Sequence, residues 1–287
     1  FIFVLFQLFV YIVIIVFVCY IRLMDNKRSN YYLKAIADAR KSSRLILISG
    51  LYGSGRSAML DEPARSLREE RPPVRIVRAS GLSGIATGSE LAQTARALGV
   101  GPSALFIDEA DSIEGLIPAL SVILKNYSTT VFITGRNSVR LENVLSPIFG
   151  PGGSGDLAIV RINTLSYAEF LSAVGIAESR DALDQYCRIG GLPQSLMVSP
   201  ESPDSPEFAR IRANSFILTE IVERHSLRNP TQLRALLELA ARSTGESLPA
   251  RQVCDAFRAE RVTISPQAAL DYLGFCAESG ILVPVPT

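Results

Sequence analysis

The stretch LILISGLYGSGRSAML (residues 45–60) is the most informative part of the sequence for the fold class. Its first residues form an unbroken apolar run, which is typical of a strand buried on both faces of a parallel sheet. A glycine-rich turn follows, and the residues after the turn favour a helix. Gly50, Gly55 and Ser57 fit the frame G-x-x-x-x-G-K-[ST] of a phosphate-binding loop, although Arg56 stands where that frame has lysine. The stretch therefore predicts a strand, a phosphate-binding loop and a helix.

The residue types of this loop suit a bound polyphosphate. Glycines allow successive backbone N–H groups to turn toward a phosphate, and the amino end of the following helix adds a favourable dipole. The hydroxyl of Ser57 is expected to bind Mg²⁺. The predicted nucleotide-binding residues are Gly50, Tyr52, Gly53, Ser54, Gly55, Arg56, Ser57 and Ala58.

The stretch ALFIDEAD (residues 104–111) predicts a second buried strand, which ends in two acids. Asp108 would hold Mg²⁺ through water, and Glu109 would orient and deprotonate an attacking water. The alternative is a strand whose acidic end is merely solvated. Because the stretch follows a phosphate-binding loop, we favour the catalytic interpretation.

A third strand, VFITGRNS (residues 131–138), ends in polar side chains beside the expected γ-phosphate position. Asn137 is the first candidate for holding the attacking water, and Thr134 is the second. The alternative is an ordinary turn at the end of a strand.

Strands and helices alternate from residue 33 to about residue 162, which is the pattern of a doubly wound α/β domain with a parallel sheet. Strands are predicted at 44–49, 74–79, 104–109, 130–135 and 157–162. The rest is mostly helical. Ser166 with Glu169 has capping-box spacing, and Ser265 with Pro266 marks another helix start. Residues 281–287 show strand character.

Composition limits the function classes. The chain has 287 residues, of which 48% are hydrophobic and 20% charged, and its formal net charge is +1. This balance gives no sign of a nucleic-acid binder or an enzyme for acidic substrates. The four cysteines form no C-x-x-C pair, so no zinc site is indicated and a reducing cytoplasm is the expected location.

Residues 1–21 form an apolar segment long enough to span a membrane. Arg22, Lys27 and Arg28 follow it and would place the rest of the chain inside the cell, anchored to the inner face of the membrane. The alternative is a translated upstream region of residues 1–23, because Met24 begins a natural opening and the segment lacks the Ala, Gly and Ser common elsewhere.

Together and in this order, the motifs resemble the AAA+ ATPases. The resemblance is to a prokaryotic group with a winged-helix unit and, usually, a C-terminal nuclease-like domain. It also rests on INTLSYAEFL (162–171), YCRIGGLP (186–193) and ALDYLGFCAESGIL (269–282), and it extends from about Tyr31 to the chain end. It implies ATP and Mg²⁺ as cofactors. It further implies a core at 24–163, a helical lid at 164–228 and a truncated winged-helix-like unit at 229–287.

The chain departs from this group at informative positions. Arg56 keeps the positive charge of the usual lysine, but its planar guanidinium is bulkier than an ammonium. Asp156 aligns with a candidate charge-stabilising arginine, near Arg161, and Thr164 replaces the usual proline. Loss of a finger-type arginine can cost on the order of 10³-fold in rate. These changes favour nucleotide binding over fast turnover.

Three functions follow from these features. The first is a slow Mg²⁺-dependent ATPase that works as a conformational switch, which Asp108 and Glu109 favour. The second is a pseudo-ATPase that binds nucleotide and presents its C-terminal unit to a protein partner, which Arg56 and Asp156 favour. The third is a DNA-binding regulator. It ranks last because helix 265–280 contains no Lys or Arg.

The single histidine, His225, has no nearby cluster of titratable residues in the sequence, so we predict a surface or helix-end position. Arg224 and Arg228 could approach a nucleotide. We favour the alternative that both are solvated charges.

Overall fold

The computed structural model describes residues 27–70, 72, 74–81, 84–135, 138–197, 205–227, 230–259 and 261–285. The chain divides into two compact units, with the boundary between Arg210 and Ile211. Residues 1–21, Arg228 and Asn137, for which the sequence makes predictions, lie outside the described residues. Within those ranges, no helix combines the length and apolar character needed to cross a membrane.

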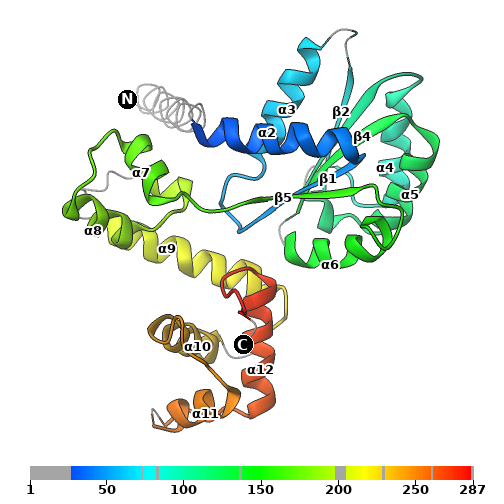
Figure 1. Ribbon diagram of the computed structural model, residues 1–287. Helices are drawn as coiled ribbons and strands as arrows, with labels where there is room; N and C mark the ends of the chain where they lie inside the picture. Colours follow the sequence, from blue (N-terminus) through cyan, green and yellow to red (C-terminus); the bar gives the residue numbers. More distant parts are fainter. Residues whose placement is uncertain are drawn as a thin grey trace, which may run out of the picture. The chain divides into compact units, whose positions relative to one another are not determined.

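The first unit is built on a five-stranded parallel sheet with the strand order β2-β3-β4-β1-β5 (Figure 1). The strands are β1 (Leu45–Gly50), β2 (Arg75–Ser80), β3 (Ser103–Asp108), β4 (Thr129–Thr134) and β5 (Leu157–Ile162). All five strand predictions are confirmed, as is the doubly wound α/β class. Because β1 lies between β4 and β5, the loop after β1 begins at an interior position of the sheet's carboxyl edge. Ligands of such folds bind at this edge.

Helices cover both faces of the sheet, which explains why its strands are continuously apolar. Figure 1 shows α2 (Lys27–Ser42) and α3 (Ala58–Glu69) on one side, with α4 (Gly88–Ala95) and α5 (Leu116–Asn126) on the other. Leu45 and Leu47 of β1 pack with α4 and α5, whereas Ile46 and Ile48 pack with α2 and α3. These four residues are fully buried, and each contributes roughly 1.5–3 kcal/mol.

The remaining elements of this unit are mostly helical. They are η1 (Arg96–Leu98), η2 (Ala110–Ser112), α6 (Ser138–Phe149), α7 (Tyr167–Val174), α8 (Arg180–Ile189) and η3 (Pro193–Met197). Helix α9 (Ser205–Ile217) crosses the unit boundary. The predicted capping box begins α7: Glu169 N–H donates to Ser166 Oγ, and Ser166 N–H donates to Glu169 Oε2 at 2.7 Å.

The second unit is helical and has its own core. A π-helical turn, η4 (Leu218–Glu223), is followed by α10 (Pro230–Arg242), α11 (Ala250–Ala259) and α12 (Pro266–Glu278). Leu233, Val253, Phe257 and Cys276 are among its buried residues. Ser265 caps α12 by accepting from Ala268 N–H at 3.1 Å, as its position before Pro266 predicts.

The strand predicted after α12 is wrong for the residues that are described, 281–285. Instead, the backbone N–H groups of Ile281 and Leu282 both donate to the Cys276 carbonyl, at 3.0 and 3.1 Å. Gly280 permits this reversal because its φ is +78°, a conformation that costs glycine little. The two N–H groups that a strand would need for pairing are thus used to end the helix.

Candidate functional site

The glycine-rich loop joins β1 to α3 at the carboxyl edge of the sheet, in the predicted strand–loop–helix order. Gly53 and Gly55 have φ values of +82° and +98°, so the loop backbone uses conformations that favour glycine. At Gly50, an added Cβ would lie 2.2 Å from the Ile162 carbonyl oxygen. The first glycine is therefore required by the close approach of β5, and the later ones by the turn.

The other predicted loop residues line the same turn. Tyr52 is partly exposed, Ser54 is fully buried, and Ala58 is the first residue of α3. This arrangement directs the start of α3 toward the carboxyl edge of the sheet, which is where a polyphosphate would meet the helix dipole.

A hydrogen-bonded cluster joins this loop to the ends of β3 and β4. The Ser57 hydroxyl donates to Asp108 Oδ1 at 3.1 Å, and the Thr134 hydroxyl donates to the same oxygen. Glu109 N–H donates to Asp108 Oδ1 at 3.1 Å and to Thr134 Oγ1 at 3.2 Å. The structure thus brings together both predicted metal ligands, the predicted base and the second water-holding candidate.

Glu109 has the left-handed backbone conformation, with φ 53° and ψ 45°. This conformation is uncommon for a residue with a side chain and costs on the order of 1–3 kcal/mol. The turn that follows maintains it, because the Glu109 carbonyl accepts from Ser112 Oγ at 2.7 Å and from Ser112 N–H at 3.2 Å. Such strain is typical of functional sites.

Arg56 lies between the loop and the end of β4. The residue is 7% exposed, and its Nη1 donates to the Gly135 carbonyl directly after β4. The guanidinium is therefore fixed against backbone at the sheet edge, beside the Asp108–Thr134 cluster. Asn137, the other predicted catalytic residue near this edge, stays a prediction because it lies outside the described residues.

Two features of the loop surroundings were not predicted from the sequence. Ser138, at the start of α6, donates to the Gly50 carbonyl at 2.8 Å and accepts from Gly50 N–H at 2.9 Å. Leu192 Cδ2, just before η3, and Gln194 Oε1, within η3, would lie 3.7 and 3.9 Å from a Cβ added at Gly53. Ser138 belongs to the VFITGRNS stretch and Leu192 to the YCRIGGLP stretch. The sequence of neither stretch shows that its end reaches the glycine-rich loop.

Ser138→Ala is expected to destabilise the protein by about 1–3 kcal/mol, because both backbone groups of Gly50 lose a partner at a largely buried position. Chemical denaturation would measure the loss in unfolding free energy, provided that its dependence on denaturant concentration is the same in both proteins. Ser121→Ala is the control, since its exposed hydroxyl bonds only within α5, to the Ile117 carbonyl. Equal stability of the two variants would contradict the anchoring role of Ser138.

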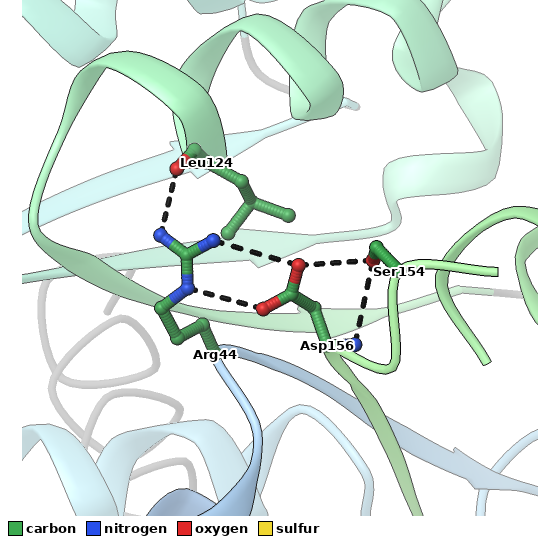
Figure 2. A network of polar contacts seen from close by, with 4 residues as sticks. All are labelled: Arg44, Leu124, Ser154 and Asp156. Atoms are coloured by element: carbon green, nitrogen blue, oxygen red, sulfur yellow. Dashed lines mark hydrogen bonds and ion pairs between the residues drawn. The ribbon is translucent and has the colours of Figure 1, made fainter. Parts of the chain in front are cut away.

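Asp156 lies just before β5, at the amino edge of the sheet, and Figure 2 shows its polar contacts. Its carboxylate accepts from Arg44 Nε at 3.1 Å and from Ser154 Oγ at 2.9 Å, and Arg44 Nη1 donates to the Leu124 carbonyl at 2.7 Å. The network ties the amino ends of β1 and β5, whereas the loop follows the carboxyl end of β1. Asp156 is therefore an ion-pair partner in this chain, about one strand length, roughly 20 Å, from the loop.

His225 and Arg224 belong to the helical unit. The His225 ring stacks on Phe275 with centroids 3.8 Å apart, and Arg224 Nη2 donates to buried Glu220 at 2.6 Å. The arginine is thus largely buried in an ion pair, and a solvated charge was the wrong alternative for it.

Burial also raises the pKa of the Cys276 thiol to about 12, so this cysteine stays protonated near neutral pH.

The donor chemistry of the loop cluster fits a nucleotide with Mg²⁺. Ser57 and Asp108 supply hydroxyl and carboxylate oxygens, which are hard ligands of the kind Mg²⁺ prefers. Within the described ranges, no three His, Cys, Asp or Glu side chains come together as a metal-binding group.

Comparisons with known proteins agree with this architecture. No protein-family model matches the sequence. The uncharacterized protein MJ1544 of Methanocaldococcus jannaschii is 21% identical over 189 residues, which cover 62% of this chain and 42% of that protein. The chain thus spans less than half of the length of this relative.

Among solved structures, the Walker-type ATPase PABY2304 of Pyrococcus abyssi has a TM-score of 0.62 at 12% identity, with 89% of each chain covered. The Aeropyrum pernix ORC2 protein has a TM-score of 0.49 at 11% identity, covering 88% of this chain and 87% of its own. RuvB of Thermotoga maritima has a TM-score of 0.43 at 15% identity, covering 91% and 88%. At these identities a likeness concerns the fold alone: the chain shares the fold of the Walker-type ATPase, with a five-stranded parallel sheet between layers of helices.

Proposed function

We propose that this chain binds ATP with Mg²⁺, hydrolyses it slowly and uses the nucleotide as a conformational switch. The hydrogen-bonded cluster of Ser57, Asp108 and Thr134 beside the glycine-rich loop carries the proposal. A parallel-sheet edge that gathers two hydroxyls, a carboxylate and a glycine-rich turn suits a metal-bound polyphosphate. The fold supports the same assignment, because P-loop ATPases bind nucleotide at this edge.

Each residue of the site has a role in this proposal. The residues from Gly50 to Ala58 named above hold the phosphates through backbone N–H groups and the Arg56 charge. Ser57 binds Mg²⁺, and Asp108 holds it through water. When bound, Mg²⁺ neutralises charge on the β- and γ-phosphates. Glu109 orients and deprotonates the attacking water, which Thr134 and Asn137 help to position.

Gly55→Asp is expected to abolish ATP binding measured by calorimetry in the presence of Mg²⁺. Gly55 has φ +98°, which is strained for aspartate, and the added carboxylate would repel the phosphates. The control is Gly152→Asp, because a Cβ at Gly152 meets no atom within 4 Å and lies at the other edge of the sheet. Unchanged ATP binding in the Gly55 variant would remove the loop from the site.

The pseudo-ATPase is the second candidate, and the contact between Arg56 and the Gly135 carbonyl favours it. A guanidinium fixed against backbone cannot follow charge on a phosphate as a lysine ammonium does. In this case, the C-terminal unit, which we propose to be a winged-helix-like module, would bind a protein partner. Leu270 on α12 is 53% exposed and is available for such a contact.

DNA binding is disfavoured by α12, which exposes Gln267, Leu270 and Asp271 and contains no Lys or Arg. A helix that reads a DNA groove needs cations close to phosphates.

We further propose a cytoplasmic location, with attachment to the membrane only if residues 1–21 act as an anchor.

A further inference from the structure

A cavity of about 280 Å³ adjoins the Ser57–Asp108 pair on the side of the edge strand β2. Its lining residues include Ser57, Asp61, Arg78, Phe106 and Asp108. We propose that Arg78 is a phosphate-binding residue of the nucleotide site, which contacts the γ-phosphate of ATP from this cavity. The inference rests on the proposed function and adds a cation that no sequence motif indicates.

The strand register places Arg78 near the metal-binding pair. In the parallel pairing of β2 and β3, Arg78 is level with Phe106, and Ser80 is level with Asp108. Arg78 therefore lies two residues, about 7 Å, before the level of Asp108. Ile76, on the same face of β2, packs in the core beneath α2 and α3. The Arg78 side chain thus extends on the face covered by α3, the helix that begins after Ser57.

Side-chain contacts hold the guanidinium at the cavity wall. Arg78 Nη1 lies 2.6 Å from Asp61 Oδ1 in the first turn of α3, and Arg78 Cζ lies 5.9 Å from the centre of the Phe106 ring. The Arg78 side chain is 48% exposed. It can therefore turn toward a ligand, unlike buried Arg56, whose guanidinium is fixed by the Gly135 carbonyl.

The chemistry of the cavity favours a phosphate on its metal side. Ser57 and Asp108, which would hold Mg²⁺ beside the phosphates, both line this cavity. A guanidinium has donors in a planar fork that matches phosphate oxygens. Asp61 pairs with Arg78 in the free protein and competes with the phosphate for the same donors.

Arg78→Ala is expected to weaken ATP binding about tenfold in calorimetry with Mg²⁺, while ADP affinity changes less than about twofold. A γ-phosphate contact predicts this difference between the two nucleotides, whereas a structural role would not. Arg78→Lys should retain part of the ATP affinity, because it keeps the charge and loses the fork. Thermal unfolding would show that the variants are folded.

Asp61→Asn distinguishes a role of Arg78 in binding ATP from a role of the Arg78–Asp61 ion pair in stability alone. Because it removes the competing carboxylate, it is expected to raise ATP affinity about twofold, in line with a solvent-exposed pair. If the pair only stabilised the fold, Asp61→Asn and Arg78→Ala would weaken binding alike. Arg65→Ala is the control for the loss of a positive charge. Arg65 lies on α3, as Asp61 does, and its exposed side chain pairs with Glu62 at 2.7 Å.

Equal loss of ATP and ADP affinity in Arg78→Ala, or no loss of either, overturns the role of Arg78 while nucleotide binding by the unaltered chain stands. If the unaltered chain binds neither nucleotide, the proposed function fails, and this inference fails with it.

Discussion

Glu109→Gln is expected to lower the single-turnover rate of ATP hydrolysis by about 10²- to 10⁴-fold, the range of a general base. Glu109 follows Asp108 at the end of β3, and its left-handed backbone is held by the Ser112 contacts. Glutamine preserves the size of the side chain but cannot accept the proton of the attacking water. Binding of ATP should persist, since the loop and the Ser57–Asp108 pair are unchanged.

The measurement is hydrolysis of limiting labelled ATP by excess protein, in the Arg56→Lys background so that the starting rate is high enough. Glu114→Gln is the matched control, because Glu114 is an exposed acid in the same connection between β3 and α5. A Glu109→Gln variant as fast as its parent would contradict the assignment of Glu109 as the base.

Arg56→Lys is expected to raise the single-turnover rate about tenfold or more, which corresponds to about 1.4 kcal/mol of barrier. In the native chain, the guanidinium donates to the Gly135 carbonyl and is buried at the sheet edge. A lysine ammonium is compact and can follow the γ-phosphate as charge moves, so it stabilises the transition state more than the ground state. ATP affinity should therefore change much less than the rate.

Arg65→Lys is a suitable control, because it makes the same exchange at an exposed position of α3. If the Arg56→Lys variant is as slow as the native chain, the pseudo-ATPase interpretation gains. That outcome would also direct attention to Leu192 and Gln194, whose side chains lie on the side of Gly53 where a Cβ would point. A native chain that already hydrolyses ATP at rates typical of AAA+ enzymes would contradict the importance assigned to Arg56.

The fold could be predicted because each signal in the sequence is local. Buried parallel strands are apolar throughout, so LILIS (residues 45–49) indicated a strand without any knowledge of its neighbours. The glycines after it are required by backbone conformations that other residues adopt at a cost. Capping at Ser166 and Ser265 is likewise decided within four residues of chain.

The parts of the site that depend on pairing between distant strands could not be predicted. The direction of Arg56 is decided by the end of β4, the Ser138 bonds by the proximity of α6 to Gly50, and the Arg78 cavity by strand register. Asp156 shows the same limit. Alignment with a family motif suggested a charge near the nucleotide, whereas the ion pair with Arg44 gives it a structural role at the other edge.

Nucleotide binding itself is tested by titration of the chain with ATP in a calorimeter, with Mg²⁺ and then with a chelator. We expect one nucleotide per chain, with affinity at least about tenfold weaker without Mg²⁺ and a similar loss in Asp108→Asn, because Asp108 and Ser57 are proposed to hold the metal. No binding heat with Mg²⁺, or an affinity that neither the chelator nor Asp108→Asn alters, would contradict it.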